Sequence, residues 1–96
     1  MLNSKQRAHL KSLSSKMPAI FQIGKSSISP ELITSIDEAL EKRELVKLAV
    51  LNNCMDDVEE IADTISGRTN SEVVFIVGKK IVLFRKSKKK PTIELP

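Results

Sequence analysis

Aromatic residues are scarce in this 96-residue sequence, which has three Phe and neither Tyr nor Trp. Proteins that hold single strands of nucleic acid by stacking the bases depend on aromatic side chains, so their scarcity argues against stacking as the main mode of recognition. The one Cys cannot form an internal disulfide, and nothing therefore indicates an oxidising compartment. The longest apolar runs have only the length of a strand, and no signal peptide is recognisable. We expect a cytoplasmic protein that makes no contact with a membrane.

Residue types that support catalysis or bind metals are also few. His9 is the one histidine, and it has no neighbours at metal-ligand spacing. Cys54 follows two asparagines and is more typical of a buried or turn thiol than of a nucleophile. We therefore expect no catalytic residue, no metal and no cofactor, and we interpret the chain as a protein that is not an enzyme.

The charges follow a pattern along the chain. Residues 1–30 contain five basic residues and no acidic one, and residues 31–72 contain four basic and eleven acidic residues. Residues 73–96 contain seven basic residues and one acidic residue. The net charge of +4 therefore conceals two basic ends around an acidic middle. If the ends meet in space, they form a basic face that suits a polyanion.

Hydrophobic periodicity predicts three helices and four strands, because apolar residues recur at helical spacing in three segments and form short runs in four others. The expected order is helix 3–16, strand 19–23, helix 30–43, strand 45–51, helix 56–69, strand 72–77 and strand 81–85. Two right-handed crossovers that progress in one direction place the second and third helices on the same sheet face. The final strand then pairs antiparallel beside the third. This predicts an α/β fold of the two-layer α+β type, with helices packed on a four-stranded mixed sheet.

Local signals mark the ends of these elements. Asn3 and Gln6 have the spacing of a capping box for the first helix, and Ser29 is a suitable N-cap for the second. Asn70 is expected to end the third helix in the left-handed conformation. Gly78 stands first in a two-residue hairpin turn, which predicts type II′ geometry.

A loop between the first strand and the second helix is the first candidate site, and its residues are Gly24, Lys25, Ser26 and Ser27. A helix N-terminus favours phosphate, so we expect Lys25 to contact a phosphate and the other three residues to supply hydrogen bonds. The loop also resembles the end of a P-loop. That motif needs a glycine five positions before Gly24, where this chain has Ala19. A small nucleotide-binding protein that uses this loop stays an alternative, as does a plain turn without a ligand.

Basic residues on two other elements add to this candidate site. They are Lys5, Arg7 and Lys11 on the first helix and Lys79, Lys80 and Arg85 on the hairpin. Two ordered elements at opposite ends of the chain are seldom basic by accident, so the pattern predicts contacts to a nucleic-acid backbone. A second alternative is a protein-interaction module that docks a partner through its acidic helices.

Four segments in a fixed order carry a family resemblance that covers nearly the whole chain. They are residues 4–11, the loop at Gly24, residues 39–47 and residues 77–85. These segments are similar to the CRM domain (chloroplast RNA splicing and ribosome maturation) in its bacterial single-domain YhbY-like form. The resemblance implies a four-stranded mixed sheet similar to the C-terminal domain of translation initiation factor three. It also implies binding to RNA in precursors of the large ribosomal subunit.

The resemblance gives a specific role to the Gly24 loop. The family carries a G-x-x-G pattern between its first strand and second helix, like that of KH domains. Gly24 matches the first glycine, and Ser27 stands where the family has the second. Because a positive φ is costly for serine and easy for glycine, we expect the loop to bind RNA in an altered geometry or more weakly.

These features predict a single RNA-binding domain over residues 1–86 and a basic tail over residues 87–96. The predicted function is to bind ribosomal RNA and to assist assembly of the large ribosomal subunit. RNA is the expected partner, ribosomal proteins are further candidates, and the chain is expected to act as a monomer.

Overall fold

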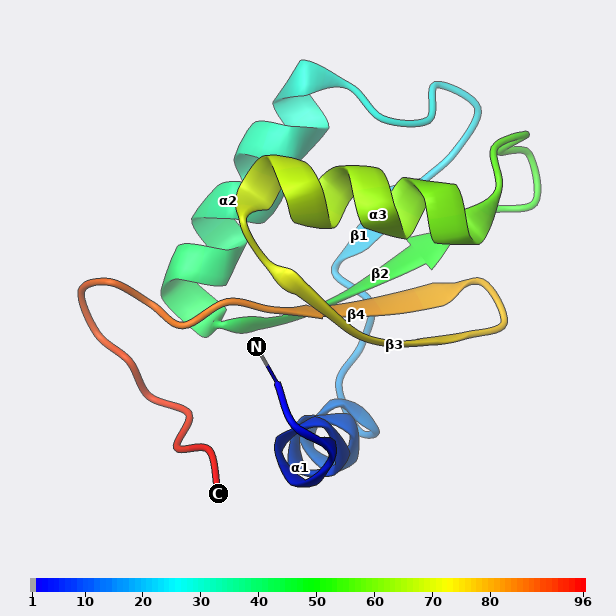
Figure 1. Ribbon diagram of the computed structural model, residues 1–96. Helices are drawn as coiled ribbons and strands as arrows, with labels where there is room; N and C mark the ends of the chain where they lie inside the picture. Colours follow the sequence, from blue (N-terminus) through cyan, green and yellow to red (C-terminus); the bar gives the residue numbers. More distant parts are fainter. Residues whose placement is uncertain (1) are drawn as a thin grey trace.

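The computed structural model describes residues 2–96, and within them the chain forms three helices and a four-stranded sheet (Figure 1). The elements are α1 (Ser4–Ser14), β1 (Phe21–Ile23), α2 (Pro30–Arg43), β2 (Leu45–Val50), α3 (Val58–Thr69), β3 (Glu72–Val77) and β4 (Lys80–Phe84). The predicted α/β fold, with this order of elements and a mixed sheet, is confirmed. Every element begins and ends within two residues of its expected position.

The helix ends are fixed by the capping residues that the sequence predicts. The Gln6 N–H donates to the Asn3 side chain over 2.8 Å, and the Asn3 N–H donates to the Gln6 side chain over 3.1 Å. At the start of α2, the Leu32 N–H donates to Ser29 Oγ over 3.1 Å. Asn70 ends α3 in the left-handed conformation, with a φ of 54°. The N-terminal caps supply partners to N–H groups that the first turn of a helix leaves unpaired.

The strands lie in the order β1-β2-β4-β3. β1 and β2 pair in parallel, and β4 pairs antiparallel with both of its neighbours. The expected pairing of the final strand with the third is confirmed, but β4 lies between β2 and β3, so the crossover to β3 skips one position. Residues 81–84 are all buried, and a strand that is apolar on both faces is most stable inside a sheet. Gly78 has a φ of 57° while Lys79 has no positive φ, as a type II′ turn requires.

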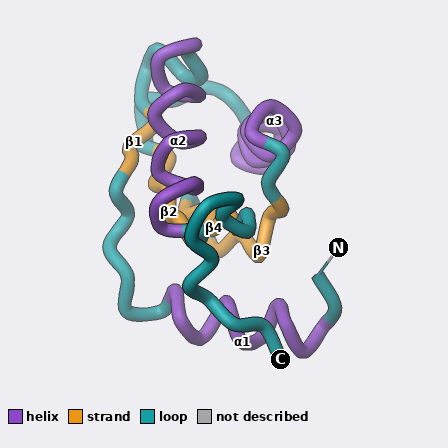
Figure 2. Tube along the Cα trace, turned by 90° about the vertical axis from the view of Figure 1, so that its left-hand side faces the viewer, coloured by secondary structure: helices purple, strands orange, loops and turns teal. Residues whose placement is uncertain are grey.

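Helices cover both faces of this sheet, so the molecule has three layers (Figures 1 and 2). α2 and α3 cover one face, as predicted, and α1 covers the other together with the C-terminal segment. The sequence predicts two layers, and the structure has a third, which is formed by α1 on the other face of the sheet. The third layer is needed because alternate residues of β4 belong to two hydrophobic cores, one on each face of the sheet. Ile81 and Leu83 pack under α2 and α3, whereas Val82 and Phe84 pack with Leu10 of α1.

Candidate nucleic-acid interface

Three connecting segments meet at one end of the sheet, on the right-hand side of Figure 1. They are the loop at residues 24–27, the turn at residues 52–53 and the hairpin turn at residues 78–79. β1, β2 and β3 run in the same direction, so their carboxyl ends all reach this edge. In open α/β sheets, ligands bind outside the carboxyl ends of the strands. We name these three segments, together with Lys80, the loop end.

Hydrogen bonds and close packing join the three segments of the loop end. The Val50 N–H donates to the Lys79 carbonyl over 2.7 Å, and Lys79 Nζ donates to Asn52 Oδ1 over 3.0 Å. Asn53 packs against the loop, because a Cβ atom at Gly24 would lie only 3.3 Å from Asn53 Oδ1. Glycine at position 24 therefore permits the close approach of the loop to the turn.

Ser27 adopts a left-handed backbone conformation, with a φ of 54°, that glycine adopts at little cost. The Ser27 N–H donates to the Gly24 carbonyl over 2.9 Å and closes the turn. The Ser27 hydroxyl donates to the carboxylate of Asp56, which lies just before α3. This side-chain hydrogen bond offsets part of the cost of a positive φ in serine. The loop therefore keeps a tight turn, with Lys25 and Ser26 exposed at its tip.

The loop end carries exposed positive charge. The side chains of Lys25, Lys79 and Lys80 are all exposed. α2 begins just beyond the loop and adds the positive end of its helix dipole. Asp56 accepts from the Ser27 hydroxyl and adds a negative charge beside the loop. The exposed lysines and the start of α2 are the features of the loop end that favour an anion.

The lysines of α1 form a separate flank of the molecule. Lys5 and Lys11 are exposed, and α1 lies across the sheet from α2 and α3 (Figure 2). Lys11 Nζ lies 5.2 Å from the centre of the Phe75 ring, a distance at which a cation is attracted to the ring face. The structure therefore places these two lysines beside the sheet and not among the segments of the loop end.

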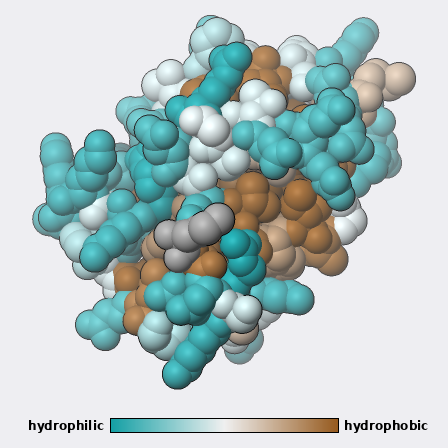
Figure 3. Space-filling view, viewed as in Figure 1, coloured by the Kyte–Doolittle hydropathy of each residue, from teal (hydrophilic) through white to brown (hydrophobic). Residues whose placement is uncertain are grey.

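Arg7, also on α1, is engaged within the fold. Its Nη1 atom donates to the carbonyl oxygen of Val73 and, over 2.9 Å, to that of Val74. The register of β3 shifts between Val73 and Phe75, so two successive carbonyl groups are available to one guanidinium. Figure 3 shows apolar side chains gathered over β3 on this face of the molecule. Arg7 thus covers part of an open sheet edge.

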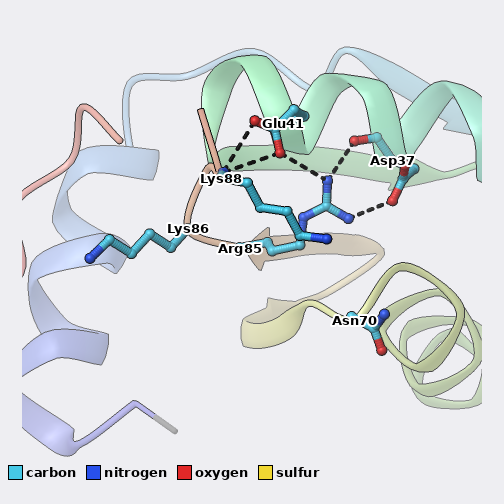
Figure 4. A pocket seen from close by; sticks show the side chains of 6 residues that line it. All are labelled: Asp37, Glu41, Asn70, Arg85, Lys86 and Lys88. Atoms are coloured by element: carbon cyan, nitrogen blue, oxygen red, sulfur yellow. Dashed lines mark hydrogen bonds and ion pairs between the residues drawn. The ribbon is translucent and has the colours of Figure 1, made fainter. Parts of the chain in front are cut away.

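Arg85 is engaged as well, at the end of the sheet opposite to the loop end (Figure 4). Its guanidinium pairs with the Asp37 carboxylate over 2.5 Å and donates to the Thr69 carbonyl over 2.7 Å. Glu41 lies 4.0 Å away, and only 15% of the Arg85 side chain is exposed. Both arginines of the predicted site are therefore partly buried and bound to carbonyl or carboxylate oxygens of the protein, whereas Lys79, which donates to Asn52, is still exposed.

Sequence reasoning missed three residues of this region, namely Asn52, Asn53 and Asp56. The expected strand 45–51 and helix 56–69 leave the asparagines in a connecting segment, but the sequence does not predict the contact of this segment with the Gly24 loop. The two asparagines could have been found from their position relative to the strands. The turn follows the carboxyl end of β2, and parallel pairing brings that end beside the carboxyl end of β1.

Metal-ligating side chains are not clustered in the part of the chain that the structure describes. Within residues 2–96, no group of three His, Cys, Asp or Glu side chains is placed to hold a metal ion. Cys54 is buried. Over the same residues, no helix is both long enough and apolar enough to cross a membrane.

The chain matches the family model of the CRS1 / YhbY (CRM) domain over residues 2–85. It is 41% identical over 96 residues to the Probable RNA-binding protein YqeI of Bacillus subtilis (strain 168), with 100% of both chains covered. It is 27% identical over 95 residues to a protein of Haemophilus influenzae named RNA-binding protein, with 99% of this chain and 95% of the relative covered. Among solved structures, protein SAV1595 of Staphylococcus aureus, described as a candidate RNA-binding protein, matches with a TM-score of 0.83. That match has 48% identity and covers 100% of both chains.

Proposed function

Because this chain belongs to the CRS1 / YhbY (CRM) domain family, we propose that it binds RNA through its loop end. The observation that carries the proposal is the meeting of exposed lysines with a tight turn and a helix N-terminus. Lysine side chains and helix N-termini both bind phosphate groups favourably. The relatives named as RNA-binding proteins support the choice of RNA among polyanions. The binding role requires no catalytic residue, and we propose no enzymatic activity.

The residues of the loop take different roles in this proposal. Lys25 neutralises a phosphate, and the Ser26 hydroxyl donates a hydrogen bond to a phosphate oxygen. Gly24 keeps the turn close to Asn53, so that the backbone at the tip faces outward. Ser27 holds the turn in place, because its hydroxyl already donates to an acidic side chain within the protein.

Lysines outside the loop extend the proposed contact. Lys79 and Lys80 lie in the same region as the loop, while Lys5 and Lys11 add positive charge from the flank on α1. Arg7 and Arg85 stabilise the fold in this proposal, since their guanidinium groups have partners in the protein. Binding therefore depends on lysines and backbone groups, which suits recognition of RNA shape and backbone more than base stacking.

We further propose that the RNA is ribosomal RNA in precursors of the large subunit and that the protein assists assembly of that subunit. This part rests on the resemblance of the four sequence segments to the CRM domain. The protein would act in the cytoplasm as a monomer, with ribosomal proteins as further partners.

The test of RNA binding compares the protein with the variant K25Q/K79Q. Binding to a transcript of large-subunit ribosomal RNA is measured by fluorescence anisotropy over a range of salt concentrations. Each phosphate contact to single-stranded RNA contributes about 0.7 to the slope of log K against log salt. We therefore expect the two substitutions together to reduce the slope by about 1.4.

A matched control is the variant K16Q/R68Q, which loses the same charge from two exposed positions outside the proposed contact. We expect this control to keep most of the wild-type slope. Binding that does not depend on salt, or an equal loss in both variants, would refute the proposed interface. Calorimetry with ATP and GTP in magnesium completes the test, because tight nucleotide binding would favour a nucleotide-binding protein instead.

Crosslinking in cells, followed by sequencing of the attached RNA, tests the role in assembly. We expect enrichment of large-subunit ribosomal RNA. Enrichment of messenger RNA without ribosomal RNA would refute the assembly role and leave RNA binding intact.

A further inference from the structure

The C-terminal segment follows a fixed path over the molecule (Figures 1 and 2). Its main anchor is the fully buried carboxylate of Glu44. The Ser87 N–H donates to this carboxylate over 2.8 Å. Further along the chain, the N–H groups of Thr92 and Ile93 donate to it over 2.7 Å and 2.8 Å. Ile93 and Leu95 also pack against the core on the α1 side of the sheet.

A second carboxylate, that of Glu41, holds the lysine run between these anchors. The Ser87 hydroxyl donates to it over 2.6 Å, and the Lys88 and Lys89 N–H groups each donate over 3.2 Å. The Lys90 N–H donates to Ser87 Oγ over 3.1 Å. The backbone N–H groups of all three lysines are therefore hydrogen-bonded, while the three lysine side chains are exposed.

Both carboxylates are held in the charged form. Hydrogen bonds from the Ser87 hydroxyl and the next two N–H groups lower the pKa of Glu41 from its ordinary value of 4.5. Burial opposes ionisation of Glu44, but the hydrogen bonds from the C-terminal segment outweigh it, and the pKa of Glu44 is lowered as well. At neutral pH the two anions thus hold the backbone of the segment and leave its ammonium groups free.

The anchored segment completes a group of exposed basic residues, which we name the tail surface. It consists of Lys42, Arg43, Lys86, Lys88, Lys89 and Lys90. None of the six belongs to an ion pair within residues 2–96, where the ion pairs involve Arg85. Figure 4 shows Lys86 extending away from the Arg85 pairs. A ligand that binds here does not have to order the backbone of the lysine run, which lowers the entropic cost of binding.

The tail surface lies at the opposite end of the sheet from the loop end, and α2 runs between them from Pro30 to Arg43. A helix of this length spans about 20 Å. The exposed side of α2 carries Glu31 and Glu38, which repel a polyanion laid along the helix. Two basic regions separated by an acidic one suit an RNA that touches the protein at two separate places.

We propose that the tail surface is a second contact site for the phosphate backbone of the RNA that the loop end binds. The inference rests on the proposed function and extends it from one contact region to two. It assigns a binding role to residues 86–90 and to the last turn of α2. From the charge pattern of the sequence alone, residues 86–90 could equally be a solvated tail without a ligand.

The test uses poly(U) RNA, the full-length protein and the variant K88Q/K89Q/K90Q over a range of salt concentrations. We expect this variant to reduce the slope of log K against log salt by about 2, at about 0.7 for each of the three contacts. The variant K88R/K89R/K90R keeps the charge and is expected to keep the slope. Thermal unfolding should be the same in all three proteins, because Glu41 binds the backbone of the segment and not the lysine side chains.

The variant K25Q/K79Q in the same assay distinguishes failure of this inference from failure of the proposed function. A wild-type slope in K88Q/K89Q/K90Q, with a reduced slope in K25Q/K79Q, would overturn the second site and leave the loop end intact. A reduced slope only in K88Q/K89Q/K90Q would support the tail surface and overturn the loop end. If the wild-type protein binds neither poly(U) nor the transcript of large-subunit ribosomal RNA, both fail.

Discussion

Ser27 shows how a single side chain can replace the conformational freedom of glycine. A left-handed φ costs a residue with a Cβ atom about 1 kcal/mol or more, yet Ser27 has a φ of 54°. Its hydroxyl donates to Asp56, and its N–H closes the turn on Gly24. The G-x-x-S form of the loop is therefore stabilised from outside the loop, by a residue at the start of α3.

We expect Asp56→Ala to lower the free energy of unfolding by about 1 kcal/mol, the usual net value of a hydrogen bond. In a chain that already carries Ser27→Gly, the same substitution should have little effect, since there is no hydroxyl to lose. Chemical unfolding of the four chains in this double-mutant cycle measures the coupling. Asp63→Ala, which removes an exposed acid from α3, is the control and should show no coupling. Equal effects of Asp56→Ala in both backgrounds would contradict this account of the loop.

Glu44 is a fully buried acid, and its partners lie in the C-terminal segment. Removing the charge should destabilise the fold, because one buried and two partly buried N–H groups then face a weaker acceptor. We expect Glu44→Gln to cost about 3 kcal/mol at neutral pH, measured by urea unfolding. Glu38→Gln, an exposed acid on the same helix, should cost much less.

The same residue predicts a pH dependence. The pKa values of Glu41 and Glu44 are lowered in the folded state, so near pH 4.5 the unfolded chain binds more protons than the folded protein. The two carboxylates therefore contribute fully to stability above pH 4.5, and this contribution is lost as the pH falls below 4.5. The gap in stability between the wild type and Glu44→Gln should narrow in acid. A gap that stays constant down to about one unit below 4.5 would contradict the assigned role.

The sequence could not predict which basic side chains of the site are exposed and which have partners within the protein. Lys25 and Arg85 look alike in a count of charges, but one is exposed in a loop and the other is paired with Asp37. The pairing joins residues 48 positions apart in the chain. Helical or strand periodicity carries no information on such a contact, whereas the loop itself was predictable from its glycine and its helix cap.

Among the elements, β3 forms one of the two edges of the sheet, and β1 forms the other. Val77 is 57% exposed, and the bulge near Val74 is covered by Arg7 from α1. Unpaired edge groups beside apolar side chains are a template for pairing with another chain. Arg7 therefore protects the edge and also fastens α1 to the sheet.

We expect Arg7→Met to lower the free energy of unfolding by about 1–3 kcal/mol and to promote self-association. Sedimentation velocity over a range of protein concentrations would detect the association. Lys5→Met is the matched control, because it removes one charge from an exposed position of the same helix. A strictly monomeric Arg7→Met protein would show that the edge needs no such protection.

The elements themselves were predictable to within two residues, because caps and periodicity act over short distances along the chain. The order of the strands was not. A hairpin turn fixes only that β4 pairs with β3, and either side of β3 satisfies that condition. The choice follows from burial, since residues 81–84 are apolar on both faces and the sheet has α1 on one side and α2 and α3 on the other.

At the scale of the whole molecule, the path of the chain determines where its positive charges lie. The basic residues between positions 79 and 90 fall into two regions, because β4 runs from the loop end to the opposite end of the sheet. Lys79 and Lys80 stay with the Gly24 loop, while residues 86–90 form part of the tail surface. One basic stretch of sequence thus supplies two separate surfaces, about the length of α2 apart.

The central place of β4 also has a consequence for biosynthesis. Of the four strands within residues 2–96, β4 is translated after the other three, yet both β2 and β3 need it as a neighbour. We expect a chain that ends at Lys79 to show no cooperative thermal transition by circular dichroism, and a cooperative transition in that truncated chain would disprove the expectation. Until the ribosome has added β4, only β1 and β2 can pair, so the four-stranded sheet forms after β4 has been synthesised and not strand by strand.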